Sequence, residues 1–151
     1  MAGSGRAEMR ALGESIVTTQ SAEIGKMNAW LAQWYPGRPT TVDYRPMMRD
    51  LSGLTGDALD ETFLRDMIPH HMAAVMMSQR MLVQGRAEHR EVADFARTVR
   101  DTQHGEIFQM NGYLADWFGG DWPMPYGAHP AGGGAPCTGG APWGPGGMMG
   151  R

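Results

Sequence analysis

The spacing of apolar positions along the chain predicts long helices. Between residues 57 and 84, apolar and soft side chains recur in steps of three and four, which places them on one face of an α-helix. The positions on this face are Phe63, Met67, His70, Ala74, Met77 and Met81. A similar period runs through residues 6–35 and through residues 88–118. The pattern predicts an all-α fold with three long helices over these ranges.

Proline and glycine mark the expected ends of these helices. Pro36 and Pro39 end the first helix and open a crossover connection over residues 36–56. Gly85 suits the C-terminal cap of the second helix. The helical domain is therefore expected to occupy residues 6–118.

Pro69 lies within the second predicted helix, where it removes a backbone donor and crowds the carbonyl four residues earlier. The alternative is a helix whose first turn begins near Pro69. Acidic residues at positions 57, 60 and 61 indicate an earlier helix start, because they suit the positive end of the helix dipole. We therefore expect a bend at Pro69 that aims His70 and His71 inward.

An internal repeat relates the first and third predicted helices. Residues 19–35 align without gaps on residues 102–118, and nine of the seventeen pairs are identical. The matched seam positions are Gln20 with Gln103, Glu23 with Glu106, and Met27 with Met110. In the second unit a Met/His helix precedes this motif, whereas the first unit has no such helix.

A duplicated helix pair would give four helices, and only three are present. We expect a helical bundle that either remains three-helical, gains its fourth helix from a partner copy, or begins at a start codon downstream of the true one. An exposed apolar seam on the first helix would be costly, so a homodimer is a reasonable hypothesis.

Composition changes at Gly119. More than half of residues 119–151 are glycine or proline, which cannot build a packed core, so this segment is expected to be a disordered tail. Its residues are either incidental or a loose metal-scavenging set. The candidates in the tail are His129, Cys137, Met148 and Met149.

Size and charge exclude several classes of function. The 151 residues allow one domain with a modest core, and the net charge of −3 offers no basic surface for nucleic acid. No apolar run is long enough to cross a membrane, and the first residues lack the apolar stretch of a signal peptide. We therefore expect a soluble, unprocessed protein.

Methionine is the unusual component of the composition. The chain has 14 methionines but only 1 cysteine, which excludes an internal disulfide and a multi-cysteine zinc site. Methionine is most often a flexible core filler. Here, however, a histidine and several thioethers share one predicted helix face. Thioether and imidazole together suit Cu(I) and suit Mg²⁺ or Ca²⁺ poorly.

Other chemistries fit the sequence less well. A di-iron carboxylate site requires Glu-x-x-His pairs, and neither Glu88 nor Glu106 is followed by histidine three residues later. No Cys-x-x-Cys-His motif for haem attachment exists, which leaves only a noncovalent haem pocket open. Nothing orients a base towards Cys137 or Ser78, so an enzyme with a nucleophile is not expected.

A non-metal interpretation also fits the seam. Gln20, Glu23, His70, Gln103 and Glu106 would then form a buried polar network that fixes helix register, in a helical module that dimerises or binds another protein. From spacing alone, this interpretation and a metal site are about equally supported.

A family resemblance favours the metal site. Met67-Ile68-Pro69-His70-His71, followed by Gln103-x-x-Glu106-Ile107-x-x-Met110, resembles the domain of unknown function 305, over residues 10–118. That family is described as ferritin-like helical bundles whose characterised members bind copper, support copper tolerance and mostly lie outside the cytoplasm. The resemblance implies ligand roles for Met67, His70, His71, Met77 and Met110, with Gln103 and Glu106 as near neighbours. Most members carry the Met-x-x-His-His helix twice, whereas this chain has it once.

The sequence thus predicts a protein that binds Cu(I), or Cu(II) or Ag(I), and sequesters or hands over the ion without catalysis. We expect His70 and Met67 at the centre and Met110 closing the site, with His71 either supporting a ligand or serving as an alternate ligand. Met77 and Met81 complete the predicted ligand set. The residues expected to orient these ligands, or to bind the ion in their place, are Gln20, Glu23, Met27, Gln103, His104 and Glu106. Family resemblance favours an extracytoplasmic location, although no signal peptide is recognisable.

Overall fold

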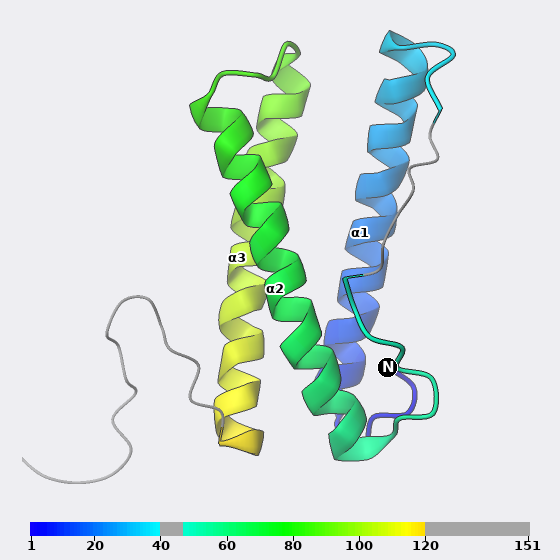
Figure 1. Ribbon diagram of the computed structural model, residues 1–151, viewed down its shortest axis with the longest axis vertical. Coiled ribbons are helices and arrows are strands. Elements are labelled where there is room, and N and C mark those ends of the chain that lie inside the picture. Colours follow the sequence, from blue (N-terminus) through cyan, green and yellow to red (C-terminus); the bar gives the residue numbers. More distant parts are fainter. Residues whose placement is uncertain (40–46, 120–151) are drawn as a thin grey trace, which may run out of the picture.

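The computed structural model describes residues 1–39 and 47–119, which form three helices (Figure 1). The helices are α1 (Ala7–Trp34), α2 (Gly56–Val83) and α3 (Arg90–Phe118). Each bound lies within two residues of the sequence prediction, and no strand occurs among the described residues. The all-α prediction is confirmed, and three helices, not four, are present in residues 1–39 and 47–119. The central part of the predicted crossover, and the tail beyond Gly119 with its four candidate ligands, lie outside these residues.

The C-terminal end of α2 shows why the chain reverses direction between α2 and α3. The backbone N–H of Gly85 donates to the Leu82 carbonyl at 3.2 Å, and the N–H of Arg86 donates to the Met81 carbonyl at 3.2 Å. These two bonds make a Schellman motif, which needs a left-handed residue, and Gly85 has φ of 60°. The chain then reverses within a few residues, so that α3 runs back along α2 (Figure 1).

The α2 helix runs without interruption from Gly56 to Val83, so the alternative of a helix beginning near Pro69 is wrong. Asp57 lies in the first turn, where an acid is favoured by the helix dipole. The Pro69 side chain is exposed, which leaves its ring outside the packed interface. The predicted bend at Pro69 stays a prediction.

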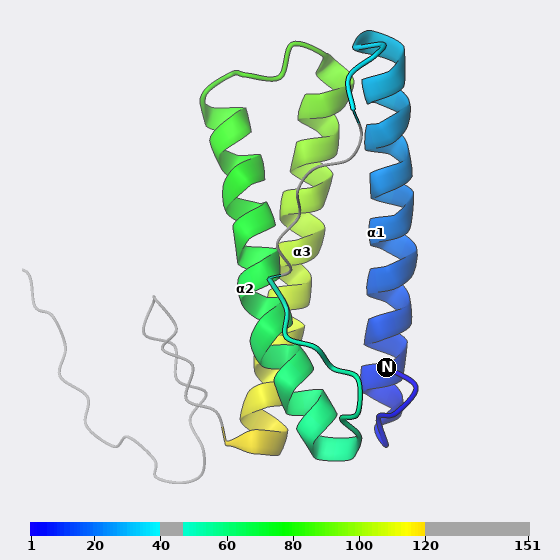
Figure 2. The same cartoon turned by 45° about the vertical axis from the view of Figure 1, so that its right-hand side comes forward.

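The core lies where the N-terminal half of α1 meets α2 and α3. Its buried residues are Met9, Leu12, Ile16, Phe63, Leu64, Met67, Ile68, Met110 and Leu114. In Figure 2 the three helices run side by side along the long axis. Close backbone packing is strongest between α2 and α3, and α1 contributes its buried side chains mainly before Val17. The C-terminal half of α1 is therefore only loosely covered by the rest of the bundle.

A charged junction fastens the helix ends at the base of the bundle. Arg6, the residue before α1, donates from Nη1 to Asp60 Oδ2 at 2.9 Å and to Asp57 Oδ1 at 2.7 Å. Its guanidinium also lies 4.7 Å from the ring centroid of Trp117, near the end of α3. Since Asp60 is fully buried, its carboxylate depends on Arg6 for a partner.

None of the three helices is both long enough and apolar enough to cross a membrane; this holds for the part of the chain that the structure describes.

Replacing Arg6 with alanine is expected to lower the Tm, because Asp60 would remain buried without its counter-charge. The matched control is Arg65→Ala, which removes an exposed ion pair with Glu61 one turn away on the same helix. Circular dichroism melts should show a clearly larger decrease for Arg6→Ala. Equal melting temperatures for the two variants would contradict the junction's structural role.

Candidate metal centre

The buried stripes of α2 and α3 face each other across the centre of the bundle. On α2, Met67 and His71 are buried and lie one turn apart. On α3, Gln103 and Met110 are buried and Glu106 lies between them. Because the two helices are antiparallel, the step from His71 back to Met67 runs in the same direction as the step from Glu106 to Met110. The imidazole and carboxylate therefore share one level and the two thioethers share the next.

His71 and Glu106 form a short hydrogen bond between the two helices. The distance from His71 Nε2 to Glu106 Oε2 is 2.6 Å, and the side chains are 0% and 15% exposed. A carboxylate at this distance needs a proton on Nε2, so the bond assigns the Nε2–H tautomer to a neutral ring. The other ring nitrogen, Nδ1, is buried and has no hydrogen-bond partner. Its lone pair is the one left free to bind a metal.

Burial keeps His71 neutral. Loss of solvent lowers the pKa of His71 below its ordinary value, and the charge of nearby His70 lowers it further. The hydrogen bond to Glu106 opposes this decrease, as does the Met67 carbonyl, which lies near the ring without completing a hydrogen bond. The net shift is downward, so the neutral imidazole, which is the metal-binding form, is favoured at neutral pH.

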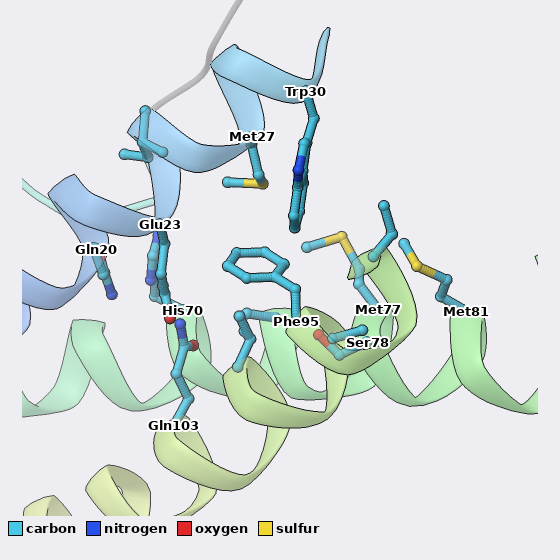
Figure 3. A pocket seen from close by; sticks show the side chains of 15 residues that line it. Gln20, Glu23, Met27, Trp30, His70, Met77, Ser78, Met81, Phe95 and Gln103 are labelled. Carbon is cyan, nitrogen blue, oxygen red and sulfur yellow. The ribbon is translucent and has the colours of Figure 1, made fainter. Parts of the chain in front are cut away.

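His70 occupies a different environment from His71. Its ring centroid lies 6.0 Å from that of His71, and its side chain is half-buried at the edge of a groove between α1 and the α2–α3 pair. Gln20 and Glu23 approach from α1, and Gln103 approaches from α3 (Figure 3). Three buried polar atoms in this cluster have no partner: Gln20 Nε2, His70 Nδ1 and Gln103 Oε1.

Two carboxylates converge on this polar cluster. Burial raises the pKa of Glu23 above its ordinary value, the charge of Glu106 raises it further, and Lys26 opposes the shift. Glu106, which is bonded to His71, is thus close enough to Glu23 to affect its pKa, so α1 and α3 each bring a carboxyl group near the histidines of α2. Such an arrangement favours a bound cation.

The structure brings several predicted ligands together and separates others. Met67, His71 and Met110 are buried, with Glu106 beside His71 and Gln103 one turn away. Met77 is largely exposed, and Met81 and Met27 line the groove with it instead of facing Met110. The predicted neighbour His104 is exposed on α3, with its ring beside Phe108.

The sequence prediction chose His70 as the inward histidine, whereas His71 is the more deeply buried of the two. The buried face of α2 contains Leu64, Met67, Ile68, His71 and Ser78. After Met67, the buried positions 71 and 78 each follow the predicted positions 70 and 77 by one residue, so the helix is rotated by about one residue relative to the prediction. The apolar side chains of Leu64 and Ile68, one turn apart, were the sequence feature that could have indicated this rotation. Met9, a seam residue of α1 that was not proposed as a ligand, is also fully buried in the core with Met67 and Met110.

Histidine, cysteine and carboxylate side chains do not form a metal site by themselves in the described part of the chain. Within residues 1–39 and 47–119, no three His, Cys, Asp or Glu side chains are grouped so that they could hold a metal ion together. A closed zinc or iron site of that type is therefore absent from the described part. The donors that the buried centre does offer are one imidazole nitrogen and thioethers, a soft set that fits Cu(I).

Comparisons with known proteins show what this chain is similar to. The family model described as "Domain of unknown function (DUF305)" matches residues 1–114 and, again, residues 60–135. No curated protein matches the chain significantly.

Two similar solved structures are both of CopM. The Cu(II)-bound form is 28% identical, with a TM-score of 0.64, and the match covers 76% of this chain and 80% of CopM. The Cu(I)-bound form is 29% identical, with a TM-score of 0.65, and the match covers 75% of this chain and 78% of CopM. The helical fold of this chain is thus similar to that of a protein solved with copper in both oxidation states.

The lowered pKa of His71 predicts how stability changes with pH. As the pH falls below about 6.5, the unfolded chain protonates this histidine while the folded protein resists protonation, so the free energy of unfolding decreases. The slope is at most about 1.4 kcal/mol for each pH unit, since one proton is involved. The decrease ends at the pKa of the folded state.

A His71→Asn variant should lack this contribution, so its stability relative to the wild type should improve between about pH 7 and about pH 5. Urea unfolding at both pH values measures the difference. The raised pKa of Glu23 acts in the opposite direction as the pH falls, but it is common to both proteins. Parallel pH dependence in the two proteins would show that His71 is not held neutral.

Proposed function

Because this chain belongs to the DUF305 family, we propose that it binds copper at the level of His71 and sequesters the ion or hands it over, without catalysing a reaction. Cu(I) is the expected form, with Ag(I) as its chemical analogue and Cu(II) as a weaker alternative. The observation that carries the proposal is the His71–Glu106 bond, which leaves Nδ1 without a partner in a bundle centre where Met67 and Met110 are also buried.

Each residue of the centre has a distinct role in this proposal. His71 supplies the imidazole nitrogen, and Met67 and Met110 supply thioethers that remain ligands at any pH because they carry no proton. Glu106 orients the imidazole and raises its basicity, as carboxylates do beside metal-binding histidines. For Cu(II), Glu106 and Glu23 are the available oxygen ligands.

The half-buried polar cluster supports entry of an ion from the groove. His70, Gln20 and Gln103 line the groove, and each has a buried polar atom without a hydrogen-bond partner. In this proposal they give an arriving ion temporary polar contacts, and His70 is an alternate ligand. The similarity to CopM in its Cu(I)-bound and Cu(II)-bound forms supports a copper ion as the cargo.

Replacing His71 with alanine is expected to weaken Cu(I) binding by more than about 100-fold, because residues that only orient a ligand contribute about 10–100-fold. Competition against a Cu(I) chelator under anaerobic conditions measures the affinity. The matched control is His104→Ala, which removes an exposed histidine from α3 and should leave the affinity unchanged. Unchanged affinity in His71→Ala, with intact helix content, would exclude this centre.

Two further variants measure how much Glu106 and His70 contribute to the copper affinity. Glu106→Gln keeps the shape of the side chain and should lower the affinity by about 10–100-fold, since the imidazole would lose its anionic partner. His70→Ala should have a smaller effect than His71→Ala. A larger effect of His70→Ala would move the centre to the groove side of α2.

A second candidate function is a non-metal helical module whose polar residues only fix register. The exposed apolar side chains Val17 and Ile24 on α1 favour a protein partner, including a second copy of this chain. The unpartnered atoms at Gln20, His70 and Gln103 argue against it, because a register network would normally satisfy its buried polar groups.

Elemental analysis distinguishes these two functions. After anaerobic loading with Cu(I) and desalting, the copper-binding protein should retain copper, and the His71→Ala variant should retain less. A protein that retains no copper but forms a dimer in sedimentation analysis would instead be the interaction module.

A further inference from the structure

Three methionines outside the buried centre line one groove. Met27 comes from α1, and Met77 and Met81 come from α2, on the opposite wall (Figure 3). The groove has a volume of about 740 Å³. Met27 is 46% exposed, Met77 is 66% exposed, and Met81 is half-buried. These three side chains therefore lie outside the packed core and border the open groove.

The internal repeat allows the exposed Met27 to be compared with a buried methionine at the equivalent position. Met27 is the repeat counterpart of Met110, which is 0% exposed because α2 covers it. The same thioether thus occurs once inside the bundle and once over an open groove. A buried methionine is accounted for by packing, whereas an exposed one opposite two further methionines is not.

The groove has two chemically different ends. Gln20, Glu23, His70 and Gln103 lie together at one end (Figure 3). At the other end, Met77 and Met81 lie near Trp30, whose ring makes an edge-to-face contact with Phe95 at 5.4 Å. Thioethers attract a soft cation and offer little to a strongly hydrated one.

We propose that Met27, Met77 and Met81 form a second binding site, specific for soft monovalent cations, with Trp30 as its aromatic wall. The inference rests on the proposed copper function but concerns a separate site on the open side of the bundle. Binding consists of coordination only: the thioethers lose no proton and no electron is transferred. The site takes Cu(I) or Ag(I) and excludes Mg²⁺ and Ca²⁺. Since it lacks the buried imidazole, it should bind more weakly than the centre at His71.

Methionine methyl NMR tests which sulfur atoms bind. The full chain, labelled with ¹³C at the methionine methyl groups, is titrated with Ag(I), and single Met→Leu variants assign the signals. The methyl signals of Met27, Met77 and Met81 should shift together, after those of Met67 and Met110. Met72 and Met76 are exposed on α2 but do not line the groove, and their signals should not move with the others. Equal shifts at Met76 and Met77 would overturn the proposal.

A pair of matched triple variants tests the stoichiometry. Met27→Leu/Met77→Leu/Met81→Leu removes the thioethers with little change in volume, and Met47→Leu/Met72→Leu/Met76→Leu removes three exposed thioethers elsewhere. The first triple should bind about one equivalent of Ag(I) less than the wild type, because one soft-ligand site is lost. The control triple should bind as the wild type does. Equal loss in both triples, or no loss in either, would show that the groove holds no site.

The same titration in a His71→Ala background separates this inference from the proposed function. If the groove signals still shift while high-affinity binding is lost, both proposals are supported. If high-affinity binding is lost but the groove methyl groups never respond, the groove site is wrong and the buried centre stands. If the groove responds and high-affinity binding is unaffected by His71→Ala, the buried centre is wrong and the groove site stands.

Discussion

The hydrogen bond between His71 and Glu106 constrains the whole α2–α3 pair. Both groups are largely removed from water, and a buried carboxylate or imidazole without a partner is costly. Sliding α2 by one turn along α3 would separate them, so the bond fixes the register of the two helices. The position of Met67 opposite Met110 follows from that register. A bond that stabilises the fold thus also sets which methionines lie at the neighbouring level of the helix pair.

The first helix divides the molecule into a closed half and an open half. Before Val17, α1 places Met9, Leu12 and Ile16 in the shared core, and the Arg6 junction fastens its start to α2 and α3. Beyond that point a groove lies between α1 and the other two helices, and α1 meets the start of α3 through aromatic contacts of Trp30 with Phe95 and of Trp34 with His89. The repeated Gln-x-x-Glu-x-x-x-Met motif therefore occurs in two settings. On α3 it is buried against α2, and on α1 it faces the groove.

In the proposals made above, this difference in setting gives one sequence motif two kinds of metal chemistry. In the buried copy the carboxylate holds an imidazole and the thioether is shielded from water, which favours strong and selective binding. In the groove copy the carboxylate has a raised pKa and the thioether is exposed, which favours weaker binding and exchange with the solvent. A protein that sequesters or hands over an ion benefits from both.

Local sequence rules accounted for the helices and for the residues of α3 that face inward. The three helix ranges follow from apolar periodicity, the cap at Gly85 follows from its freedom to adopt positive φ, and the single stripe of Gln103, Glu106 and Met110 leaves one choice of inward face. The soft character of the ligand set also follows from composition, since methionines are abundant and there is only one cysteine.

The choice between His70 and His71 was decided by the tertiary structure. The two residues are adjacent, about 100° apart around the helix, and both border an apolar stripe, so periodicity alone tolerates either as the inward residue. The rotation of α2 about its axis is set by how Leu64 and Ile68 pack against the other helices, and that packing turns His71 inward and leaves His70 at the groove. The same rotation exposes Met77. Sequence determined which side chains were available for a soft metal, and helix packing determined which of them meet, because contacts between distant segments depend on orientations that no local pattern encodes.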